Sequence, residues 1–142
     1  MGESWVLWAL LSAAFAAATA VLAKAGSADI DPDLATLIRT AVVLVSLVVL
    51  VTITAKWNPQ TPLSRQTVLL LVLSGLATGA SWLCYFRALK AGEVSKVAPV
   101  DKLSVVLVAV FAVVFLRERL SGREWAGVGL VAAGVVVLAL KR

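Results

Sequence analysis

The chain has 142 residues, of which 61% are hydrophobic and 15% are charged, and its mean hydropathy is +1.00. This composition excludes an ordinary water-soluble globular domain, in which apolar residues make up nearer half of the chain. The formal net charge of +5 does not indicate nucleic-acid binding, because Lys and Arg are scattered at the ends of apolar segments and do not line one face.

Five continuous apolar segments fill most of the chain. At a rise of about 1.5 Å per residue, roughly 20 helical residues cross the roughly 30 Å hydrocarbon core of a bilayer. The runs do not alternate with polar residues, which favours helices over barrel strands. The sequence therefore predicts an all-α integral membrane protein that forms one five-helix domain over 1–142, with its termini on opposite sides of the membrane. The expected helices cover 5–24, 34–55, 68–90, 95–116 and 124–140.

Capping signals occur where these helices should begin. Asp31 followed by Pro32 is typical of an N-cap and a first helical residue. Ser64 can cap the third helix, and Ser121 with Glu124 three residues later predicts a capping box for the fifth. These signals support the expected starts of three of the five helices.

The fourth segment contains Pro99 and Asp101, and its start is open. If the helix begins at Ser95, Pro99 bends it and Asp101 is a carboxylate inside the membrane. If it begins at Pro99, Asp101 is the third helical residue, where a carboxylate suits the unpaired N–H groups and the positive helix end. Asp101 is then either functional or simply a good helix-start residue.

The distribution of basic residues leaves the orientation undecided. We call the side of the N-terminus side A and the opposite side B. Side A has five basic residues and side B has eight, but three of those eight, Arg39, Arg87 and Lys102, lie inside their segments and are poor topology signals. The remaining balance of five against five predicts that copies insert both ways up and pair as an antiparallel dimer. A single fixed orientation is the alternative.

Ionisable residues inside the segments all lie toward side B. Such groups are costly in a bilayer and usually face a cavity or a partner. Asp101 is expected to pair with Arg39 or Arg87, and we interpret these residues with Lys102 and Lys24 as a substrate-binding or gating cluster. Lys24 and Arg87 have the alternative of extending to the interface with no further role.

Two aromatic residues of the third segment, Trp82 and Tyr85, are three residues apart and share a helix face. They either line a central cavity, where their rings would accept a cation or stack on a planar solute, or pack the helices.

The fifth segment is rich in small residues, which allow the backbones of membrane helices to approach closely. We expect it to form the contact between two copies, through Gly127, Gly129, Ala133 and Gly134.

Several motifs together resemble the EamA family of the drug/metabolite transporter superfamily. They are SGLATGASWLCYFRALKAG over 74–92, APVDKLS over 98–104, ERLS over 118–121 and LATLIRT over 34–40. Typical members have ten spans in two inverted five-span repeats, and this chain resembles one repeat. The fifth segment is also similar to the last helix of small multidrug resistance proteins, which pair in antiparallel fashion through it.

The resemblance implies a multi-pass transporter in a bacterial-type inner or cell membrane. Its expected partners are lipid, a second antiparallel copy and a small solute, moved by alternating access and coupled to protons through Asp101. The alternative is a non-transporting accessory or assembly subunit, such as a partner of a lipid-linked-sugar flippase. The chain has no His, one Cys and no cofactor or metal motif, so we expect no enzyme activity, cofactor or metal.

Overall fold

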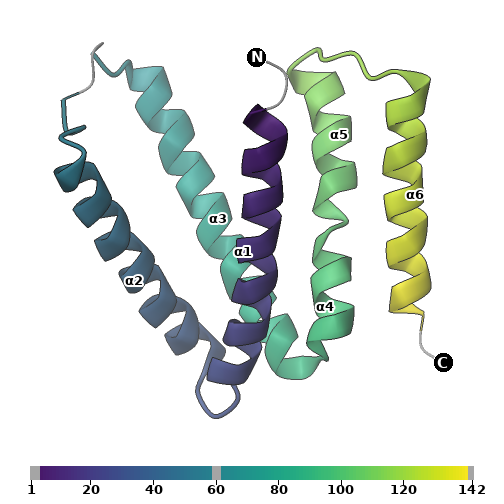
Figure 1. The fold of residues 1–142 in the computed structure, drawn as a ribbon, viewed down its shortest axis with the longest axis horizontal. Helices are drawn as coiled ribbons and strands as arrows, with labels where there is room; N and C mark the ends of the chain where they lie inside the picture. The colour runs from purple at the N-terminus through teal and green to yellow at the C-terminus, as the bar shows by residue number, and fades with distance from the viewer. Residues whose placement is uncertain (1–3, 59–61, 141–142) are drawn as a thin grey trace. The chain divides into compact units, whose positions relative to one another are not determined.

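The computed structural model describes residues 4–58 and 62–140, without the side chain of Ser4, and all of its regular elements in that part are helices. Five stretches are long and apolar enough to cross a membrane, and they match the five predicted segments to within three residues at each end. The all-helical membrane fold is therefore confirmed. The helices are α1 (Ser4–Gly26), α2 (Pro32–Ile53), α3 (Arg65–Ala91), α4 (Val94–Asp101), α5 (Ser104–Phe115) and α6 (Gly122–Ala139) (Figure 1).

The predicted caps explain why three helices begin where they do. The Asp31 carboxylate accepts hydrogen bonds from the backbone N–H groups of Asp33 at 2.8 Å and Leu34 at 3.3 Å, and Pro32 follows as the first residue of α2. At the start of α3, the Ser64 hydroxyl accepts from the Thr67 N–H at 3.0 Å. The capping box before α6 is complete. These bonds satisfy donors that have no partner within the helix, and the three predictions are confirmed.

The fourth span is interrupted. Helix α4 begins at Val94 after the N-cap Glu93, continues through Pro99 and ends at Asp101, and α5 begins at Ser104. Asp101 is therefore the last residue of α4, and its interpretation as a helix-start residue is wrong. Across the interruption the backbone bonds tighten to three-residue spacing, as in Lys102 N–H to Pro99 O at 2.9 Å.

Helices α2 and α5 end on left-handed residues that are not glycine. Ala55 has φ 52° and Arg117 has φ 57°. Beyond each helix the chain turns back to bond a carbonyl of the last turn, from Lys56 N–H to Val51 O and from Glu118 N–H to Ala112 O, both at 3.1 Å. These bonds satisfy end carbonyls as a glycine cap would, at the steric cost of a side chain in the left-handed region.

The chain forms two compact units, 1–91 and 92–142. In the first unit, α3 contacts both α1 and α2. Its buried residues lie toward the end at which α1 and α3 finish and α2 begins, which corresponds to side B of the sequence. We call this the B end of the first unit. The buried residues are Ala20, Ser27, Ala35, Thr36, Phe86 and Leu89.

In the second unit, α6 packs against α4 and α5. Among its described residues Val135 is buried, whereas the large apolar side chains of α5 are mostly exposed. In a membrane protein such side chains face lipid or other helices, because hydrocarbon is as apolar as they are. This unit therefore has little packed interior of its own.

Candidate functional site

The B end of the first unit brings several predicted site residues together. Lys24 comes from the last turn of α1, Arg39 from the second turn of α2, and Trp82 and Arg87 from the C-terminal half of α3. Each of these four side chains contacts a helix other than its own. The structure therefore brings these four predicted residues together at one end of the first unit.

Arg39 is half-buried and lies on aromatic rings. Its guanidinium carbon is 4.2 Å from the centroid of the Trp82 ring and 5.8 Å from that of Phe86. Trp82 and Phe86 are four residues apart on α3, so they share one face of the helix. This stacking of a delocalised cation over aromatic faces lowers the cost of placing Arg39 inside an apolar segment.

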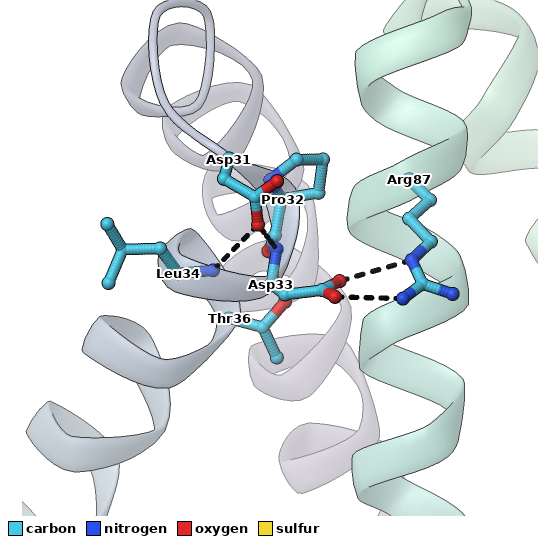
Figure 2. A network of polar contacts seen from close by, with 6 residues as sticks. All are labelled: Asp31, Pro32, Asp33, Leu34, Thr36 and Arg87. Carbon is cyan, nitrogen blue, oxygen red and sulfur yellow. Dashed lines mark hydrogen bonds and ion pairs between the residues drawn. The ribbon is translucent and has the colours of Figure 1, made fainter.

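Arg87 pairs with a carboxylate in the first turn of α2. Its Nε and Nη2 atoms donate to the two carboxylate oxygens of Asp33 at 3.1 and 2.8 Å, which is a bidentate pair. Figure 2 shows this pair beside the Asp31 cap, so that the two acidic residues on either side of Pro32 have different roles. The pair connects the first turn of α2 to α3 at the B end. Asp33 thus occupies the position expected for Asp101 as the partner of Arg87.

Two lysines donate to main-chain carbonyls across the same end. Lys24 Nζ donates to the carbonyl of Leu89, and Lys90 Nζ donates to those of Ala28 at 2.6 Å and Ile30 at 3.2 Å. The last turns of α1 and α3 and the chain that joins α1 to α2 are therefore connected through lysine ammonium groups. Lys24 has a structural contact here beyond simple extension to the interface.

The first unit has two hollows near the B end. The larger, about 330 Å³, lies between α1 and α2 and reaches Phe86 of α3; its lining is mostly apolar and includes Arg39 as the single charged residue. We call this the Arg39 groove. A smaller cavity of about 210 Å³ is lined by Lys24, Lys90, Ser27, Ala28 and Leu89. The Arg39 groove is the better candidate binding site, because its size and apolar lining with a few polar groups match small-ligand pockets.

Asp101 and Lys102 lie in the second unit, at the interruption between α4 and α5. Lys102 Nζ is 3.2 Å from Asp101 Oδ2, and both side chains are partly exposed. The proposed pairing of Asp101 with Arg39 or Arg87 stays a prediction. Tyr85 is half-buried on α3, to one side of the face that Trp82 presents to Arg39.

The four small residues predicted as a dimer contact do not form one face of α6. At about 100° per residue, Gly127 and Gly134 are about 20° apart and Gly129 and Ala133 about 40° apart, but the two pairs are separated by about 130°. Val135, which is buried, lies on a third side. A Cβ added at any of the three glycines would have no neighbouring atom within 4 Å. A second helix could therefore contact one pair or the other, but not both at once.

Sequence reasoning missed Asp33, Phe86 and Lys90 as site residues. Asp33 reads as a normal first-turn carboxylate, and its partner is 54 residues away. The spacing of Trp82 and Phe86 is a signal that could have been used, because residues four apart share a face as closely as residues three apart. In residues 4–58 and 62–140 there is no group of three or more His, Cys, Asp or Glu that could hold a metal ion.

Comparison with known proteins gives two results. The sequence model of the EamA-like transporter family matches residues 3–140. A protein of Sinorhizobium sp., described as "Uncharacterized transporter in cobO 3'region", is 56% identical over 140 residues, which cover 99% of each chain. No solved structure matches significantly.

Proposed function

Because the chain belongs to the EamA-like transporter family and is a multi-pass integral membrane protein, we propose that two copies pair in antiparallel fashion into a ten-helix transporter that moves a small solute by alternating access. The observation that carries this proposal is the size of the unit. The Sinorhizobium relative is matched over 99% of its length, so the whole length of that protein corresponds to one five-helix unit of the kind described above. Transporters of this type place their solute between two inverted repeats, so a second, inverted copy would supply the missing half.

The even balance of basic residues between sides A and B supports insertion in both orientations. The test places a single cysteine at Ala28, in the chain between α1 and α2, or at Asn58, beyond α2, in a Cys84→Ala background. Both positions are exposed, lie on opposite sides of the membrane and keep the charge balance. An impermeant thiol reagent on intact cells should label about half of the molecules at each site, as two equal orientations require. Full labelling at one site and none at the other would overturn the homodimer and indicate a separate, oppositely oriented partner.

The two small-residue faces of α6 give a second test of the pair. The double variants Gly127→Cys with Gly134→Cys and Gly129→Cys with Ala133→Cys each place two cysteines on one of these two faces. In an antiparallel pair an early residue of α6 meets a late residue of the partner's α6, so each double variant supplies both members of such a contact. If α6 forms the contact, one double variant should cross-link into a dimer under mild oxidation and the other should not. Cross-linking of both to the same extent would indicate random collision, and cross-linking of neither would remove α6 from the interface.

Proton coupling through Asp101 is part of the same proposal. Asp101 ends α4 beside an interruption of the fourth span, and interrupted helices often hold coupling ions in transporters. The Lys102 ammonium lies 3.2 Å from the Asp101 carboxylate, so the interruption holds a charged pair.

A further inference from the structure

The residues that line the Arg39 groove indicate which charge a bound solute should have. The walls of the groove are apolar side chains from α1, from α2 and from the chain between them, among them Leu22, Ile38 and Ile30, and Phe86 of α3 also lines it. At about 330 Å³ it has room for a small organic molecule and little more. A solute with an apolar body therefore fits against these walls, and the few polar lining groups must bind its polar part.

Arg39 is the one charged group among the lining residues. Within the described part of the first unit, no carboxylate contacts it: Asp33 is held by Arg87, and the Asp31 carboxylate caps α2. The Trp82 and Phe86 rings contact the face of the Arg39 guanidinium. The N–H groups in the plane of a guanidinium stay available when only its face is covered.

The same contacts disfavour a cation. The Trp82 face, which would otherwise attract a cationic solute, is already occupied by Arg39 at 4.2 Å. A second positive charge in the groove would meet the guanidinium, and none of the lining residues has a carboxylate to bind an ammonium group. A solute with an amine would leave that group unpaired in an apolar site.

We infer that the solute of the Arg39 groove is a small organic monoanion, a carboxylate or its chemical equivalent with an apolar body and no amine, bound in bidentate fashion by Arg39. This inference rests on the proposed function, because it takes the groove as the solute site. Trp82 holds the guanidinium plane and so positions the anion site. The inference goes beyond a preference for charge in general, because it excludes cations and zwitterions.

The test uses three probes of similar size and shape: phenylacetate, phenylacetamide and phenethylamine. The full-length protein is placed in phosphatidylcholine nanodiscs, and binding is followed by calorimetry and by the intrinsic Trp emission. Phenylacetate should bind about tenfold or more tightly than the amide or the amine, the discrimination that a charge-assisted bidentate hydrogen bond supplies. Arg39→Gln should remove the preference, whereas Arg65→Gln, an exposed arginine in the first turn of α3, should keep it.

Arg39→Lys guards against a folding defect in the glutamine variant. It retains the charge and loses the bidentate geometry, so it should bind phenylacetate more weakly but still prefer it to the amide. Equal binding of the three probes by the wild-type protein, or an unchanged preference in Arg39→Gln, would overturn the inference. So would loss of phenylacetate binding when phosphatidylglycerol is added to the nanodiscs, because the anion would then be a lipid phosphate.

The two proposals fail separately. If both orientations are labelled but the three probes bind equally, the antiparallel pair is supported and the proposal of an anionic solute is wrong. A single orientation together with phenylacetate selectivity would remove the self-paired dimer and leave the anion site of the groove.

Discussion

The contacts inside the first unit differ in kind from the contacts inside the second unit. In the first unit, side chains from different helices meet: Arg87 pairs with Asp33 of α2, and Arg39 of α2 lies on Trp82 of α3. In the described part of the second unit, the ion pairs join sequence neighbours, such as Lys96 with Glu93 three residues earlier. The first unit therefore has internal contacts that can fix the geometry of a site. The second unit has an interrupted helix and small residues on exposed faces, features that suit movement and contact with another helix.

The largest expected effect separates binding in the first unit from coupling in the second. Asp101→Asn removes the carboxylate at the α4 to α5 interruption and changes no residue that lines the Arg39 groove. In proteoliposomes with an imposed pH gradient, phenylacetate accumulation beyond that in protein-free liposomes should be abolished, because only this excess depends on the protein. Phenylacetate binding should stay close to that of the wild-type protein. An excess that persists in Asp101→Asn would show that this residue does not couple protons to transport.

The next effect concerns packing. Leu89 is fully buried in the first unit, whereas Leu107 of α5 is 55% exposed. Leu89→Ala should lower the free energy of unfolding by about 2–5 kcal/mol, because it leaves a cavity that the neighbours fill only in part. Leu107→Ala, which removes contacts with lipid or another helix, should cost less than about 1 kcal/mol. Unfolding in mixed micelles with increasing denaturing detergent measures both, and equal losses would contradict the difference in packing.

A smaller effect concerns the two kinds of ion pair. Asp33→Asn leaves Arg87 without its carboxylate and should raise amide hydrogen exchange several-fold in the chain between α1 and α2, because α2 is no longer tied to α3. Glu93→Gln removes a pair within one helical turn and should affect that turn alone.

The exchanged pair Asp33→Arg with Arg87→Asp provides the control for this prediction. It should restore most of the protection that Asp33→Asn loses, because the two charges meet again with their positions reversed. If the exchanged pair is as unprotected as Asp33→Asn, the ion pair does not hold the two helices together.

The smallest effect should be the same in both units. Ala55→Gly and Arg117→Gly each relieve a left-handed backbone that glycine adopts freely. Each should raise the free energy of unfolding by up to about 1 kcal/mol, because the steric cost of the side chain exceeds the added flexibility of the unfolded glycine. The same detergent titration measures this gain. If only one variant gains free energy of unfolding, the packing around the turn affects the gain as well as the left-handed backbone of the turn.

The helices and their caps were predictable because they depend on local chemistry. The Asp31 and Ser121 caps, for example, use donors within three residues. The site was predictable only in part. The sequence showed that charges gather at one side, but it could not choose the partner of Arg87, because Asp33 and Asp101 are both acidic and both distant in the sequence. The interruption of the fourth span also lies further along the chain than the sequence predicts. Pro99 predicts a bend, but α4 continues for two residues beyond Pro99.

The lysine contacts at the B end bear on how this protein can change during evolution. Lys24 and Lys90 donate to main-chain carbonyls of Leu89, Ala28 and Ile30. Every residue type has such a carbonyl, so substitutions at these three positions leave the acceptor in place. A search for correlated substitutions among relatives should therefore find the Asp33 and Arg87 pair and overlook the lysine contacts beside it. The lysine contacts can thus persist when an acceptor residue is replaced, whereas the ion pair needs both the Asp33 and the Arg87 side chain.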